Sequence, residues 1–215
     1  MRDWPLLEAL GDEDRRRVLA AARRRRYARR EVLWHEGDPG DTLHLIDSGR
    51  IAIRVGTPLG DTATVTVLGP GDVVGELALL DGGQGRRTAS AVALEKSETL
   101  VLHHDAFEEL RRAHPTVERF LSAVLAAQVR RLTSHLLDAL YVPADVRVAR
   151  RLLELDAVYD GGDIALTQED VATLAGTSRA TVNRVVGELE EAGAVEVRRG
   201  CIKVVDGDRL ARKAR

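Results

Sequence analysis

The sequence predicts an α+β chain, with an all-β part first and a helical part second. Three observations predict it. Short β-type runs separated by glycine-containing turns fill residues 27–102. An apolar stripe with helical spacing then covers residues 115–141, and two short helical patterns meeting at 175–176 precede a hairpin pattern at 195–205. Many short strands with turns between them indicate a sandwich or barrel, and spacings of three and four indicate helices.

Composition limits the classes of protein to which the chain can belong. With 215 residues, of which 44% are hydrophobic and 31% charged, it has room for two modest domains with solvated surfaces. The net charge is −2, so any contact with a polyanion must come from locally placed arginines. The one cysteine, Cys201, excludes an internal disulfide framework and a four-cysteine metal site. Without a signal peptide or a membrane-length apolar run, we expect a soluble cytoplasmic protein.

The first 26 residues have a helical pattern. Asp12 or Asp14 begins a segment with apolar residues at Val18 and Leu19, and arginines surround it. A charge run of this kind is usually the solvated face of a helix. The predicted strands that follow, in chain order, are 31–35, 42–46, 51–55, 62–68, 89–94 and 99–102.

A long helix is predicted after the strands. A short helix at 106–113 precedes it, and after Pro115 the helical pattern continues to about Tyr141. Its apolar residues line one stripe: Val117, Leu121, Val124, Leu125, Leu132, Leu136 and Ala139. The stripe is either a dimer interface or a face packed on its own domain, and the pattern alone does not decide. Val142-Pro143 ends the helix, and another begins at Asp145.

The stretch from Leu166 to Gly193 has the organisation of a helix-turn-helix. Thr167 can cap a first helix, Gly176 permits a tight turn, and Ser178 can cap a second helix. Apolar spacing buries Val182, Val185, Val186 and Leu189, which leaves Arg179, Ala180, Thr181, Asn183 and Arg184 on or near the exposed face. Such a helix enters the major groove, where the planar fork of arginine matches guanine. The alternative is an ordinary helical hairpin with solvated arginines. The hairpin at 195–205 adds a wing, and a short helix containing Leu210 follows.

A second group of residues fits a nucleotide. The run from Gly69 to Asp81 ends a strand and opens a short helix, and Glu76 there can accept from a ribose hydroxyl. Arg87 and Thr88 supply a cation and a hydroxyl donor for a phosphate. The alternative is a structural turn in which Glu76 and Arg87 form a salt bridge.

Several motifs together resemble the catabolite activator (cyclic AMP receptor protein) and fumarate–nitrate regulator family of bacterial transcription factors. They are Glu36-Gly-Asp-Pro-Gly-Asp41, Ser48-Gly49, Leu68-Gly-Pro-Gly-Asp72, Gly75-Glu-Leu77, Arg87-Thr-Ala89 and the run from Gly176 to Arg184. The resemblance covers essentially the whole chain. It implies an effector-binding β-roll with an N-terminal helix at 1–114, a dimerisation helix and hinge at 115–142, and a winged-helix DNA-binding domain at 143–215.

The resemblance also implies roles for residues of the β-roll and the long helix. Glu76 would accept from the ribose 2′-OH of cyclic AMP, and Arg87 would pair with the cyclic phosphate. Thr88 and the amides near Gly75, Leu77 and Ala78 would complete the pocket, and Thr133 and Ser134 would read the base. Two departures leave alternatives open: the loop before Arg87 is one residue longer, so Arg86 could be the phosphate arginine, and counting back from the hinge places Leu132-Thr133 at the base.

For DNA, the resemblance implies that Arg179 and Arg184 read guanine. Ser178 and Thr181 would contact phosphates, Thr167 would lie at the same surface, and Asn183 could touch a base edge or a phosphate. Ala180 stands where many members carry a glutamate that accepts from cytosine, so one base pair of the half-site should be less constrained or read through a thymine methyl.

The expected partners are a palindromic DNA operator, a second copy of the chain through 115–141, and RNA polymerase. No obligatory cofactor, metal site or catalytic set is expected, because the histidines are scattered and no nucleophile–base group or phosphate-binding Walker loop is visible. Two alternative hypotheses for the function are kept. One is a regulator of the same family that needs no nucleotide or responds to another molecule, and the other is a cyclic-nucleotide-binding module that acts through a protein partner.

Overall fold

The computed structural model describes residues 12–57, 60–80 and 85–215. Its contacts divide the chain into two compact units. The first comprises Met1–Val55 and Leu68–Arg131, and the second comprises Gly56–Val67 and Leu132–Arg215. The chain therefore passes from one unit to the other three times, and each unit is described by itself.

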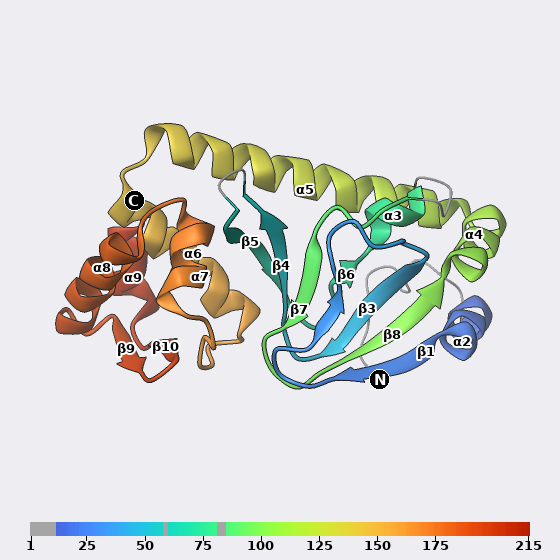
Figure 1. Ribbon diagram of the computed structural model, residues 1–215, viewed down its shortest axis with the longest axis horizontal. Coiled ribbons are helices and arrows are strands. Elements are labelled where there is room, and N and C mark those ends of the chain that lie inside the picture. The colour runs from blue at the N-terminus through green and yellow to red at the C-terminus, as the bar shows by residue number, and fades with distance from the viewer. Residues whose placement is uncertain (1–11, 58–59, 81–84) are drawn as a thin grey trace. The chain divides into compact units, whose positions relative to one another are not determined.

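Two antiparallel sheets account for the β-type runs of the sequence (Figure 1). One sheet has the order β1-β8-β3-β6, built from Arg23–Tyr27, Ser97–His103, Thr42–Ser48 and Val73–Val74. The other has the order β2-β7-β4-β5, built from Val32–Trp34, Ser90–Ala93, Ile51–Gly56 and Thr62–Leu68. Every predicted run coincides with an observed strand, whereas β1 and the two-residue β6 were not predicted.

Four helices contribute to the main core of the first unit. They are α2 (Asp12–Ala21), α3 (Glu76–Leu80), α4 (His104–Ala113) and the start of α5 (Pro115–Tyr141). Leucines of β3 and β8 pack there against Phe107, Val117 and Leu121. Because both Val117 and Leu121 are fully buried in this core, the first turns of the long helix belong to the β domain.

The N-terminal prediction was wrong in part. Helix α2 covers Asp12–Ala21, but Arg23–Tyr27 is strand β1, which pairs with β8 in the register Arg23↔Val101. The exposed arginines follow from the position of β1 at a sheet edge, where charged side chains block further pairing. Arg24 and Arg26 both form ion pairs with Glu98 of β8, so cross-strand contacts override local helical periodicity. Residues 1–11 of that prediction lie outside the described residues.

The long helix changes character along its length. Its first half carries the buried Val117 and Leu121, but large apolar side chains in its second half are exposed. These are Val129 (62% exposed), Leu132 (53%), Leu136 (60%) and Leu140 (62%), spaced by three, four and four residues. Exposure of four such side chains at this spacing is the pattern of a helix seam that another helix covers.

The second unit is helical with a small hairpin. It contains α6 (Ala144–Val158), α7 (Gln168–Ala175), α8 (Arg179–Glu191) and α9 (Gly207–Lys213), and β9 (Val195–Arg198) pairs with β10 (Cys201–Val204). The buried side chains that join these elements include Val148, Leu152, Val171, Val182, Val185, Val186, Leu189 and Leu210. Thr64, from the segment Gly56–Val67, donates to Asp170 and Thr173 of α7. None of the described helices is both long and apolar enough to cross a membrane.

The buried His44 makes the stability of the first unit depend on pH. Burial, together with the charge of Arg87, lowers the pKa of His44 to about 3. In the unfolded chain the imidazole has a pKa of about 6.5, so the unfolded state binds more protons between these two values. We expect the free energy of unfolding to fall as pH falls from about 6.5 towards 3, by up to about 1.4 kcal/mol per pH unit from this group.

Urea unfolding between pH 4.5 and 7.5 measures this slope. His44→Gln should reduce it, and the same change at the exposed His35 is the control. An NMR titration that shows the His44 ring gaining a proton near pH 6.5 in the folded protein would contradict the assignment.

Candidate ligand pocket and nucleic-acid interface

Gly75 joins β6 to α3 and lets the chain approach Arg87 closely. Its φ is +92°, and a Cβ placed there would lie 2.5 Å from Nη1 of Arg87 and 2.8 Å from the carbonyl oxygen of Thr42. No side chain fits in that space, so the position requires glycine. Directly after it, Glu76 and Ala78 are buried and Leu77 is 40% exposed. Of the predicted residues from Gly75 to Ala78, Gly75 therefore contacts the Arg87 guanidinium, and the other three form the start of α3.

Arg87 is held by neutral oxygen atoms. It is 5% exposed, and its Nη1 donates to the carbonyls of Thr42 (2.9 Å) and Gly75 (3.2 Å). Nη2 donates to the Thr42 hydroxyl at 2.6 Å, and Cζ lies 4.1 Å from the centre of the Trp34 ring. Burial lowers the pKa of Arg87, and the nearby carboxylates of Asp41 and Glu76 oppose that shift. Its Nε is buried and has no hydrogen-bond partner among the described residues.

Glu76 is bonded to the long helix rather than to Arg87. Its Oε1 accepts from Nε2 of Gln128 at 2.8 Å. Within the described ranges no ion pair joins Glu76 to Arg87, so the salt-bridge alternative was wrong: the guanidinium fork is directed at the Thr42 and Gly75 oxygens instead. Sequence reasoning missed Gln128. The available indication was a polar residue placed four residues after Val124 in the apolar stripe.

A cavity of about 410 Å³ lies beside Gln128, between the turn that precedes β6 and helix α5. This volume lies in the range of sites for small molecules. Its lining consists of apolar side chains, the Gln128 amide and two charged side chains, Asp72 and Arg131. Burial raises the pKa of Asp72, and the charge of Arg131 acts against that rise.

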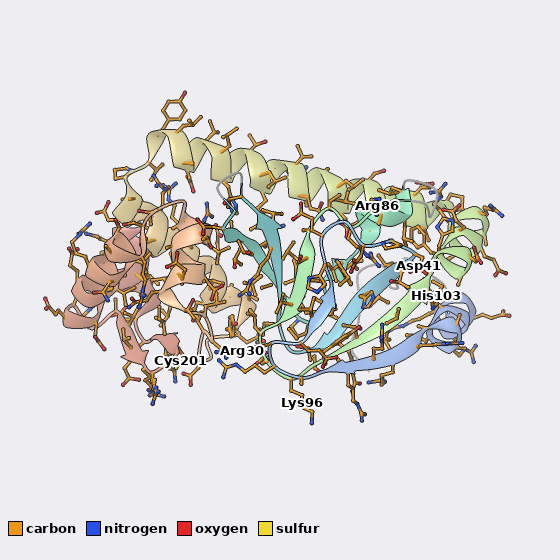
Figure 2. The ribbon with its side chains drawn as sticks, viewed as in Figure 1. Arg30, Asp41, Arg86, Lys96, His103 and Cys201 are labelled. Carbon is orange, nitrogen blue, oxygen red and sulfur yellow. The ribbon has the colours of Figure 1, made fainter. Side chains whose placement is uncertain are left out.

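Four of the residues that the sequence offered as ligand contacts are solvent-exposed. Arg86 is exposed and donates to the carbonyl of Gly37 at 2.8 Å (Figure 2). Thr88 is exposed as well. Thr133 and Ser134 are exposed on the part of α5 that belongs to the second unit. Positions 81–84, which include the start of the loop before Arg87, lie outside the described residues.

The helix-turn-helix has complete caps. Thr167 accepts from the Asp170 amide and Asp170 accepts from the Thr167 amide, both at 3.1 Å, which is a capping box. Gly176 ends α7 with a left-handed φ of +59°, and the Ser178 hydroxyl accepts from the Thr181 amide at the start of α8. These contacts fix both ends of the turn, so the direction of α8 is set by the chain's own side chains.

The exposed face of α8 carries the predicted DNA-contacting residues. Arg179, Ala180, Asn183 and Arg184 are exposed, and Thr181 is half-buried. Arg184 pairs with Glu188 at 2.5 Å, and Asn183 donates to Gln168 at 3.1 Å. Of the polar side chains that the structure describes on this face, Arg179 alone has neither a hydrogen bond nor an ion pair, which leaves its guanidinium free for an outside acceptor.

The described ranges contain no cluster of side chains that could bind a metal ion. Three or more histidine, cysteine, aspartate or glutamate side chains nowhere gather there in a way that could hold an ion. Cys201 lies on β10 in the wing hairpin (Figure 2).

Comparison with known proteins agrees with both halves of this arrangement. Residues 24–114 match the cyclic nucleotide-binding domain, and residues 146–213 match the Crp-like helix-turn-helix domain. The chain is 36% identical over 204 residues to the cyclic AMP receptor protein of Thermus thermophilus, covering 95% of this chain and 94% of that protein. It is 33% identical over 196 residues to a CRP-like cAMP-activated global transcriptional regulator of Mycobacterium tuberculosis, covering 88% and 87%.

Solved structures give the same result. The catabolite activator protein of Thermus thermophilus has 35% identity and a TM-score of 0.57, with 98% of both chains covered. FixK2 of Bradyrhizobium japonicum, at 24% identity and a TM-score of 0.78 over 90% of this chain and 98% of that chain, shows the fold alone. The predicted fold class is confirmed. The relatives are DNA-binding regulators of transcription and not enzymes, and the chain belongs to the catabolite activator (cyclic AMP receptor protein) and fumarate–nitrate regulator family.

Proposed function

We propose that this regulator is a dimer whose DNA binding is gated by a cyclic nucleotide, cyclic AMP, held in the first unit. The observation that carries the proposal is Arg87, a buried cation without a carboxylate partner in the described part of the chain, beside a buried Glu76. A buried guanidinium favours an anion, and a buried carboxylate favours a hydroxyl donor. A ribose with a free 2′-OH and a cyclic phosphate supplies both groups.

The names of the relatives support the nucleotide. Those from Thermus thermophilus and Mycobacterium tuberculosis are named for cyclic AMP. In this proposal Arg87, not Arg86, meets the phosphate, because Arg86 is solvent-exposed and donates to a loop carbonyl. Glu76 exchanges the amide of Gln128 for the ribose hydroxyl. Thr88, the amides of Gly75, Leu77 and Ala78, and Thr133 and Ser134 of α5 are the further ligand contacts.

The dimer is proposed from the exposed seam of α5. Val129, Leu132, Leu136 and Leu140 present a continuous apolar stripe, and a second copy of the same helix would cover it. Two recognition helices held by one seam suit a palindromic operator with half-sites about 34–36 Å apart. Cytoplasmic location and a contact with RNA polymerase complete the proposal and rest on the family alone.

DNA is read in this proposal by α8. Arg179 and Arg184 contact guanine, and Ser178, Thr181 and Thr167 lie at the phosphates. Asn183 contacts the DNA beside Gln168, to which it is bonded. Ala180 has no acceptor, so the base pair that it faces is constrained less or read through a thymine methyl.

Gating is tested with an operator that the full-length protein selects from randomised DNA. We expect cyclic AMP to raise the affinity for this operator by about 5- to 150-fold, measured by fluorescence anisotropy, because effector coupling has about this size. Cyclic GMP, added separately, tests the choice of base. Affinity that no cyclic nucleotide changes would remove the gating and leave a regulator that responds to something else.

Arg87→Gln and Arg86→Gln decide between the two arginines. We expect Arg87→Gln to abolish cyclic AMP binding in calorimetry and to lower the free energy of unfolding by roughly 1–3 kcal/mol, because three buried hydrogen bonds are lost. Arg86→Gln should leave both quantities nearly unchanged. Loss of ligand binding in Arg86→Gln, with Arg87→Gln unaffected, would reverse the assignment.

Arg179→Ala should weaken binding to the selected operator by roughly 1–3 kcal/mol and relax one base position. The matched change Arg184→Ala should cost less, because Arg184 must first give up its ion pair with Glu188. Competition binding against operators substituted at single base pairs measures both effects. An equal loss on the operator and on random DNA would make Arg179 a phosphate contact instead.

A further inference from the structure

Two arginines of α6 join the end of α5 to the helix-turn-helix. Arg147 and Arg151 are four residues apart, so they lie on the same face of α6. Arg147 donates through Nε to the carbonyl of Ala175 and through Nη2 to that of Gly176, both at 2.8 Å. Its remaining nitrogen, Nη1, donates to the carbonyl of Val142, just beyond α5, at 2.7 Å.

Arg151 repeats this arrangement one turn later. Its Nε donates to the carbonyl of Leu174 in α7 at 3.2 Å, and its Nη2 lies 3.3 Å from Oδ2 of Asp138 in α5. Arg151 is 3% exposed and Asp138 is 7% exposed. The other carboxylate oxygen of Asp138 accepts from Nη1 of Arg150 at 2.5 Å. Nη1 of Arg151 donates to Oε1 of Glu154, also at 2.5 Å. We call Arg147, Arg151 and Asp138 the arginine clamp.

The clamp is more than a set of surface ion pairs. The last carbonyls of a helix lack intrahelical partners and favour a cation, and the two guanidinium groups supply one to Leu174, Ala175 and Gly176 together. The planar fork of arginine fixes direction as well as distance. Arg151 and Asp138 are buried, and each has a second ionic partner, Glu154 and Arg150 respectively. The pair is therefore part of a hydrogen-bonded network of four charges, which holds both side chains in one geometry.

We propose that Arg147 and Arg151 are positioning residues that hold the turn before α8 at a set orientation to the end of α5. The recognition helix begins at Arg179, three residues after the clamped Gly176, so its direction follows the clamp. This inference rests on the proposed dimeric regulator. If two copies share α5, the clamp sets the separation of the two recognition helices and therefore the half-site spacing that the protein accepts.

Spacing discrimination tests the clamp in the full-length protein, with cyclic AMP present. One duplex is the operator selected by the wild-type protein, and a second carries two additional base pairs between the half-sites. We expect the wild-type protein to prefer the first by about tenfold or more, since spacing is a geometric requirement for paired helices. Asp138→Asn and Arg147→Lys should lower the preference to about threefold or less, while affinity for a duplex with one half-site stays within about threefold of the wild type.

Arg209→Lys is the matched control. Arg209 also donates to a helix-terminal carbonyl, that of Ala192 at the end of α8, but none of its bonds reaches α5. This variant should keep the wild-type spacing preference. Thermal unfolding checks that each variant is folded, and if Asp138→Asn does not fold, Arg147→Lys carries the test.

The outcomes separate the two proposals. A folded clamp variant with the wild-type spacing preference overturns the clamp, and so does a variant that loses affinity equally for all three duplexes, since that shows a role in stability alone. If the wild-type protein selects no operator, or selects one without two half-sites, the proposed dimeric regulator fails and the clamp fails with it.

Discussion

A buried guanidinium keeps its charge and carries five N–H donors, which favour oxygen acceptors around it. Arg87 in the first unit and Arg151 in the second are both almost fully buried, at 5% and 3% exposure. Around each of them, backbone and side-chain oxygens accept hydrogen bonds from the guanidinium group. At Arg87 this takes a left-handed glycine and the Thr42 carbonyl, and at Arg151 it takes the end of α7 and a buried aspartate. In both places the arginine joins segments that are distant in the sequence.

The two arginines differ in whether a carboxylate of the chain compensates their charge. Arg151 has carboxylate partners, so its charge is compensated within the chain. Arg87 donates hydrogen bonds only to neutral oxygens and lies over an aromatic ring, and its Nε is left without a partner among the described residues. A fully paired group is suited to hold a structure, and an incompletely paired one is suited to bind a ligand. This difference separates the clamp from the pocket on physical grounds, although both contain buried arginine.

Much of the fold could be predicted from the sequence, because its signals are local. Thr167, Gly176 and Ser178 specify caps and a turn by their own chemistry, and the structure shows each in that role. The strand at Arg23–Tyr27 could not be predicted, because it exists only through pairing with β8, which is distant in the sequence (Arg23 pairs with Val101). Gln128 and Asp138 were missed for a related reason. Each is a polar residue on a helix with an apolar stripe, and only its partner in space gives it a role.

The proposed gating needs a contact that differs between the empty and the occupied pocket, since a ligand shifts an equilibrium only by its differential affinity for the two states. Glu76 offers such a contact. Without ligand its carboxylate holds Gln128 of α5, and a ribose hydroxyl would take the same oxygen. Ligand binding would then release a side chain on the helix that also carries Asp138, ten residues further along. In this proposal the ligand replaces the hydrogen bond between Glu76 and Gln128 of α5. Because the clamp binds the end of α5 to the turn before α8, a shift of α5 would then change the orientation of the recognition helix. A coupling of one to three kcal/mol, about what one or two hydrogen bonds to a charged group supply, is sufficient for such a regulator.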